Sequence, residues 1–164
     1  MSGTGKPEQR AVDAAGLTLA VAGTRWHGEI TDTLVEHAVS AARDCGVPDV
    51  TVVRVPGAVE LPVVAAELAK RHDAVVCVGA VIRGGTPHFD YVCDAVTMGL
   101  TRAALDAGVP VGNGVLTCDT LEQARDRSGL PGSSEDKGLE ATVAALETAV
   151  LLASIRSSGR FART

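Results

Sequence analysis

The chain has 164 residues and a formal net charge of −5 at pH 7; 46% of its residues are hydrophobic and only 2% are aromatic. This length is typical of one domain, and the scarcity of aromatic side chains means that its core is built from Val, Ala, Leu and Ile. An acidic chain repels the phosphate backbone, and one Trp, one Tyr and two Phe are too few for a base-stacking surface, so a general nucleic-acid binder is disfavoured.

The two ends of the chain and its cysteines suggest where the protein works. Residues 1–15 are polar, have no apolar signal region and predict a mobile tail before one domain at 16–158, with a C-terminal tail at 159–164. No apolar run reaches the roughly 20 residues needed to span a bilayer, so we expect a cytoplasmic protein that does not bind membranes. The cysteines form no CxxC pair and have no His at metal-ligand spacing, so we expect free thiols and no metal site; they are Cys45, Cys77, Cys93 and Cys118.

The first half of the chain alternates short apolar runs with helical patterns. Residues 17–22 (LTLAVA) predict a buried strand, and apolar side chains then recur at helical spacing over 30–45. The β-branched segment 50–55 predicts a second strand, and 60–70 predicts a modest helix. Segment 74–80 is apolar throughout, which is typical of a central parallel strand.

The second half continues this alternation. A helix is expected up to about residue 107, and 109–117 predicts a fourth strand that contains two glycines. A short helix at 121–127, an irregular loop at 128–136 and a long helix at 137–157 complete the chain. Strands that alternate with helices predict a parallel sheet with helices on both faces, and ligands of such sheets bind at the carboxyl ends of the strands.

Polar residues gather at three junctions where a predicted strand leads into a helix. Because all three junctions lie at the same edge of a parallel sheet, their side chains are expected to converge on one cleft. These side chains are Trp26, His27, Glu60, Arg83 and His88.

The third junction and the tryptophan each have a chemical use and a plainer alternative. The N–H groups of Gly84, Gly85 and Thr86 precede a helix and can face a phosphate, or the segment is a simple turn; it lacks the Lys-Ser/Thr of an ATP-binding P-loop. His88 suits proton transfer near neutral pH, or is structural. Trp26 offers a flat face to a heterocycle, or packs in the core.

Other charged residues are equally ambiguous. Glu60 can bind sugar hydroxyls or cap its helix. Arg127 and Lys137 flank the irregular loop as solvated charges, and His37 and His72 are expected to be ordinary helix-surface residues. From residue patterns alone, the sequence predicts an α/β enzyme for a small phosphorylated substrate.

Five segments in order carry a more specific signal. They are Gly79–Val92 (GAVIRGGTPHFDYV), Val55–Pro62 (VPGAVELP), Gly114–Thr117 (GVLT), Glu122–Arg127 (EQARDR) and Asp136–Gly138 (DKG). Together they resemble the 6,7-dimethyl-8-ribityllumazine synthase family over roughly residues 17–155.

The resemblance implies a flavodoxin-like three-layer α/β/α sandwich with a four-stranded parallel sheet. It implies an enzyme of the penultimate step of riboflavin biosynthesis, which condenses 5-amino-6-(D-ribitylamino)uracil with 3,4-dihydroxy-2-butanone 4-phosphate. The products are 6,7-dimethyl-8-ribityllumazine, phosphate and water, and no metal or organic cofactor is required. It also implies a homopentamer, or in some members a sixty-subunit shell, with active sites shared between neighbouring subunits. Riboflavin synthase is a further partner that the resemblance suggests.

The resemblance also implies roles for individual residues. His88 would be catalytic as a proton shuttle. Substrate would be bound by Trp26, His27, Ala58, Val59, Glu60, Val81, Ile82, Gly85, Thr86, Asn113, Arg127 and Lys137, with Asn113 and Arg127 coming from the neighbouring subunit. Many family members carry Phe where Trp26 and Asn113 stand, and the loop 128–136 is slightly longer than in the commonest form.

Two other functions remain alternatives. A non-catalytic flavin- or lumazine-binding protein on the same fold would need the aromatic platform but neither His88 nor the phosphate groups. A flavodoxin-like signalling domain would need an acidic cluster at a strand end, whereas the first strand ends in Gly23-Thr24-Arg25-Trp26.

Overall fold

A computed structural model describes residues 11–158. Its elements follow the chain as β1 (Leu19–Thr24), α1 (Gly28–Asp44), β2 (Val50–Val55), η1 (Ala58–Glu60), α2 (Leu61–Leu68), β3 (Ala74–Ile82), α3 (His88–Ala107), β4 (Val111–Cys118), α4 (Leu121–Arg125) and α5 (Lys137–Ser157). The four strands form one parallel sheet in the order β2-β1-β3-β4. The predicted α/β fold is confirmed.

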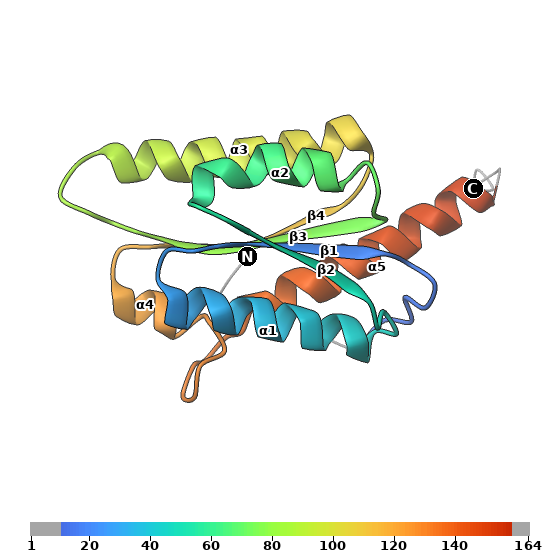
Figure 1. Ribbon diagram of the computed structural model, residues 1–164, viewed down its shortest axis with the longest axis horizontal. Helices are drawn as coiled ribbons and strands as arrows, with labels where there is room; N and C mark the ends of the chain where they lie inside the picture. Colours follow the sequence, from blue (N-terminus) through green and yellow to red (C-terminus); the bar gives the residue numbers. More distant parts are fainter. Residues whose placement is uncertain (1–10, 159–164) are drawn as a thin grey trace, which may run out of the picture.

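The sheet lies between two layers of helices. Helices α2 and α3 cover one face, and α1, α4 and α5 cover the other (Figure 1). All six residues of β1 and the first seven of β3 are buried, whereas the edge strands β2 and β4 are partly exposed. Continuous apolar runs therefore became the two inner strands, which have a helical layer on each side.

The helices bury the faces that their apolar spacing predicts. In α1 the buried side chains include Ile30, Leu34 and Ala38, and in α5 they include Val143 and Leu146. Helix α5 is long and apolar enough to cross a membrane by length and composition alone. Its buried face packs on α1, β3 and β4. The apolar composition of α5 is therefore that of a helix with one face in the core.

The start of the described chain and the thiols add to the core. Ala14, inside the predicted N-terminal tail, is buried, and its N–H donates to the carbonyl of Cys45 at 2.8 Å. Residues 1–10 of that tail and the C-terminal tail lie outside the described residues. The prediction of free thiols is confirmed for all four cysteines, and burial raises the pKa of Cys77 to about 12.

The sequence predicts that His37 and His72 are ordinary helix-surface residues. His72 follows α2, and its ring nitrogens contact the carbonyl of Leu68 at 2.9 Å and the hydroxyl of Thr51 at 3.0 Å. His37 lies on α1 as expected, but its Nδ1 is 2.5 Å from Oδ2 of Asp136. The expected helix-surface position is confirmed for His37, whose side chain is 38% exposed, and was wrong for His72, which lies after the end of α2. Both side chains also contact residues far away in the sequence.

Candidate functional site

The junctions after β1 and β2 meet at one edge of the sheet. The last residues of these strands, Thr24 and Val55, are paired in register. A Cβ built on Gly57 would lie 3.7 Å from Nε1 of Trp26, so the indole lies against the turn after β2. Trp26 is 67% exposed and is therefore a surface platform rather than a core residue.

His27 and Glu60 shape these two turns. His27 has a left-handed backbone (φ 55°) and immediately precedes α1 as its N-cap residue, and its ring centroid is 6.4 Å from that of Trp26. Glu60 accepts a hydrogen bond from the N–H of Gly57 at 2.8 Å. Glu60 thus caps its helix, as one of its two predicted roles required. Its exposed carboxylate lies at the turn after β2, against which the indole of Trp26 also lies. Ala58 and Val59 complete η1, and Val59 is 53% exposed.

The third junction is open to solvent. Side chains from Arg83 to His88 are exposed, and a Cβ built on Gly84 or Gly85 would meet nothing within 4 Å. Thr86 precedes α3, a helix of 20 residues whose first residue is His88. A phosphate can therefore approach the backbone of this loop at the positive end of the helix dipole.

Strand β3 extends past its neighbour at this edge. Its pairing with β1 ends at Val78, whereas its pairing with β4 continues to Ile82. The last residues of β3, including Val81, are thus not paired with β1. They are placed to bind a planar ligand through the backbone.

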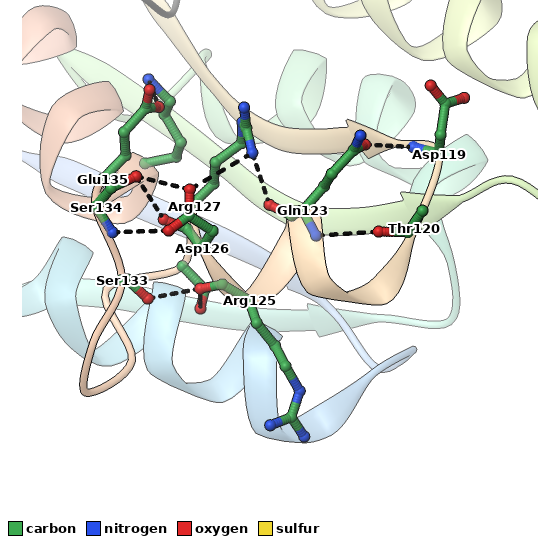
Figure 2. A network of polar contacts seen from close by, with 11 residues as sticks. Asp119, Thr120, Gln123, Arg125, Asp126, Arg127, Ser133, Ser134 and Glu135 are labelled. Carbon is green, nitrogen blue, oxygen red and sulfur yellow. Dashed lines mark hydrogen bonds and ion pairs between the residues drawn. The ribbon is translucent and has the colours of Figure 1, made fainter.

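A second group of predicted residues lines a pocket of about 160 Å³ beside β4. Oδ1 of Asn113 accepts the N–H of Val115 at 3.0 Å, and Nη1 of Arg127 donates to the carbonyl of Gln123 at 3.0 Å. Figure 2 shows Arg127 within the polar network of α4 and the following loop. The lining also includes Lys137, but not Trp26, Glu60 or His88.

Lys137 stands between two carboxylates. Its Nζ is 2.6 Å from Oε2 of Glu135 and from Oε2 of Glu140. Partial burial of the ammonium group works to lower its pKa, but the hydrogen bonds to the two carboxylates outweigh burial, so the pKa of Lys137 is raised. The ammonium group of Lys137 is therefore ion-paired and partly buried, and is not the solvated surface charge that the sequence suggested.

The sequence did not reveal every residue that builds this edge. Arg83, expected to face the cleft, is bound by Asp90 and Asp119, and no spacing rule pairs it with Asp119. The pair Lys137–Glu140 has the (i, i+3) spacing of helix ion pairs and was foreseeable. Glu135 has no such signal, because a loop brings it to Lys137.

The parallel sheet, the exposed aromatic side chain and the open glycine loop define an α/β protein whose candidate ligand site lies at the carboxyl ends of its strands. The family model described as 6,7-dimethyl-8-ribityllumazine synthase matches residues 16–153. The chain belongs to this family.

Curated relatives of this family match nearly the whole chain. The 6,7-dimethyl-8-ribityllumazine synthase of Thermobifida fusca strain YX is 65% identical over 158 residues, covering 96% of this chain and 92% of the relative. That of Frankia casuarinae is 65% identical over 160 residues, covering 97% and 100%. That of Mycobacterium leprae strain TN is 57% identical over 155 residues, covering 94% and 97%. All three names are those of an enzyme, and none supports a non-catalytic binder or a signalling domain.

Proposed function

We propose that this chain is a 6,7-dimethyl-8-ribityllumazine synthase acting in the cytoplasm, with its catalytic domain at 16–158. It condenses 5-amino-6-(D-ribitylamino)uracil with 3,4-dihydroxy-2-butanone 4-phosphate and releases phosphate and water. Besides family membership, the observation that carries the proposal is the open loop with Gly85 and Thr86 at the start of α3, beside the exposed His88.

The first substrate is assigned to the junctions after β1 and β2. The indole of Trp26, with His27 beside it, stacks on the pyrimidine ring. The backbone of Val81 and Ile82 binds the polar edge of that ring, which the extension of β3 past Val78 supports.

The ribityl chain is assigned to η1. Ala58 and Val59 contact it, and the carboxylate of Glu60 accepts hydrogen bonds from its hydroxyls. The bond from the N–H of Gly57 occupies Oε2 of Glu60 and fixes the direction of the carboxylate, which leaves acceptor capacity for a hydroxyl donor.

The phosphate group of the second substrate is assigned to the third junction. The N–H groups of Gly85 and Thr86 receive it at the positive end of α3, and the guanidinium of Arg127 from a neighbouring subunit completes the charge. Asn113 and Lys137, which line the same pocket as Arg127, then face the pyrimidine across the subunit boundary.

His88 is assigned the proton transfers. Imine formation, loss of phosphate, ring closure and dehydration each move a proton, and an exposed imidazole can both take and return one near neutral pH. Holding the amine and the ketone in contact supplies much of the acceleration, since alignment removes the entropic cost of their encounter.

The shared site requires a homo-oligomer, which we propose to be a pentamer. Tyr91, Met98 and Leu105 are 74%, 61% and 77% exposed and follow one another at intervals of seven residues along α3. A stripe of this kind on a helix face is covered in a soluble protein by a partner, here a second copy of the chain. Riboflavin synthase, which would consume the product, is proposed as a further partner.

The activity test uses the purified full chain. Both substrates are mixed with the protein, and formation of the fluorescent lumazine is followed beside a sample without protein. Accelerated formation supports the enzyme. Binding of lumazine or flavin without any acceleration would instead support the non-catalytic binder.

A further inference from the structure

The loop between α4 and α5 is closed by a short antiparallel neck. Ser128 and Asp136 form an isolated β-bridge, and the N–H of Lys137 donates to the carbonyl of Arg127 at 3.0 Å. The main chains at Arg127 and Lys137 are thus bonded to each other. A contact that holds either strand of this neck therefore also holds the backbone from which the side chains of Arg127 and Lys137 extend into the pocket.

One carboxylate joins the neck to two helices. Oδ2 of Asp136 is 2.5 Å from Nδ1 of His37 on α1, while its Oδ1 accepts the N–H of Leu139 at 3.0 Å and so caps α5. The Asp136 side chain is only 24% exposed. A Cβ built on Gly129 would lie 2.5 Å from Nδ1 of His37, so the imidazole also packs directly against the loop side of the neck.

A separate set of bonds ties the loop to α4. The carboxylate of Asp126 accepts the hydroxyl of Ser134 at 2.6 Å and its N–H at 3.1 Å, as Figure 2 shows. The guanidinium of Arg127 is held at the carbonyl of Gln123. These bonds fix the loop to its own preceding helix, whereas His37 alone among these side chains fixes it to α1.

We propose that His37, acting through Asp136, is a positioning residue for Arg127. His37 does not line the pocket, yet it anchors the backbone from which Arg127 extends. The contact is partly buried, with the His37 side chain 38% and the Asp136 side chain 24% exposed, and it restrains displacement of the whole segment. A shift of about 1 Å at a binding group is enough to weaken binding strongly. This inference rests on the proposed assignment of Arg127 to the phosphate group.

The test measures phosphate affinity directly. Inorganic phosphate is titrated into the full-length protein by calorimetry, and steady-state kinetics give KM for each substrate. His37→Ala is expected to weaken phosphate binding and raise KM for the phosphorylated ketone by about 3- to 30-fold, which lies within the range of coupling between contacting groups. KM for the uracil substrate is expected to change less than about twofold, because Glu140 on α5 still holds Lys137, and kcat is expected to change as little.

Two companion variants separate positioning from a general loss of structure. His37→Asn keeps a hydrogen-bonding nitrogen near the place of Nδ1 and is expected to restore most of the affinity. His72→Ala removes a histidine that contacts Leu68 and Thr51 instead, and is expected to bind phosphate as the unsubstituted chain does. If His37→Ala does not fold, Asp136→Asn replaces it, because Asn still caps α5 while the charge is lost.

Each failure has its own signature. Absence of lumazine formation by the unsubstituted chain would refute the proposed function, and this inference with it. Unchanged phosphate affinity in Arg127→Ala would remove Arg127 from the phosphate site. If Arg127→Ala weakens phosphate binding while both His37→Ala and Asp136→Asn leave it intact, the positioning role of His37 is wrong.

Discussion

The guanidinium of Arg83 lies over the ring of Phe89, with its Cζ 4.2 Å from the ring centroid. Its Nε donates to Oδ1 of Asp119 at 2.6 Å, and its Nη2 is 3.1 Å from Oδ1 of Asp90. Hydrogen bonds to Asp119 and Asp90 raise the pKa of Arg83. One side chain thus ties the end of β3 to the first turn of α3 and to the loop after β4, next to His88.

Replacing Arg83 with Gln is expected to slow turnover without unfolding the protein. The guanidinium is 43% exposed, so solvent screening keeps the loss of stability small. Turnover is expected to fall by roughly 3- to 10-fold, because the first turn of α3 that carries His88 loses its anchor. Steady-state fluorescence and thermal unfolding measure the two effects.

The control is Arg102→Gln on the same helix, where the guanidinium is 82% exposed and pairs with Asp106 one turn away. It is expected to leave turnover unchanged. Equal turnover in both variants would show that Arg83 does not position His88.

Replacing His88 with Ala is expected to slow turnover by no more than about 10²- to 10⁴-fold, the usual contribution of one acid/base group. The remaining rate comes from holding the two substrates together. Stability should hardly change, because His88 is exposed at the first residue of α3. A folded variant that binds both substrates but shows no catalysis at all would contradict the proximity argument.

Patterns of local origin were readable from the sequence. The apolar runs of β1 and β3 and the stripe of Ile30, Leu34 and Ala38 on α1 follow from periodicity, because burial repeats with the geometry of the element. The convergence of the junctions after β1 and β2 follows from parallel strands alone. These signals sufficed for the sheet, its two helical layers and one edge of the site.

Contacts between residues far apart in the chain could not be predicted from the sequence. The pairs Arg83–Asp119 and His37–Asp136 are 36 and 99 residues apart, and both depend on how irregular loops settle on the helices. The neck at Ser128 and Asp136 belongs to a segment whose composition predicts only a loop. Solvent exposure likewise decided between the two interpretations of Trp26, and a lone aromatic residue carries no sequence signal for that choice.

Replacing Gly138 with Ala is expected to lower the free energy of unfolding by about 1–3 kcal/mol, the cost of overpacking. A Cβ there would lie 2.4 Å from the carbonyl oxygen of Leu34, where α5 meets α1, and backbone cannot move aside as a side chain can. Urea unfolding at one protein concentration measures the change. Gly28→Ala is the control, since its Cβ would be 3.8 Å from the nearest atom, Oδ2 of Asp32; a loss of similar size there would refute the steric explanation.

Replacing Met98 with Glu is expected to dissociate the proposed oligomer. The substitution places a charge in the middle of the exposed apolar stripe of α3, and burying that charge without a partner costs several kcal/mol. Sedimentation velocity should show smaller species, and lumazine formation should fall because the proposed site includes residues of two subunits. Ser40→Glu introduces the same side chain at an exposed position of α1 and is expected to change neither. A full-sized assembly of the Met98 variant would exclude this stripe from the interface.

Acid is expected to loosen the attachment of the loop to α4 through Asp126. Hydrogen bonds from the hydroxyl and the N–H of Ser134 lower the pKa of this carboxyl group. A carboxyl group whose pKa is lowered by folding stabilises the fold above its ordinary pKa, and this stabilisation is lost as the pH falls through the lowered value. Ser134→Ala should move the pKa of Asp126 upward, because the hydroxyl donor is lost. Hydrogen exchange at the amides of residues 134 and 135 should then accelerate at a higher pH than in the unsubstituted chain. Carboxyl-carbon NMR titration gives the pKa, and Ser133→Ala is the control, since the Ser133 hydroxyl donates to the carbonyl of Arg125 instead. If Asp126 titrates identically in the two variants, the Ser134 hydroxyl does not hold the loop to α4.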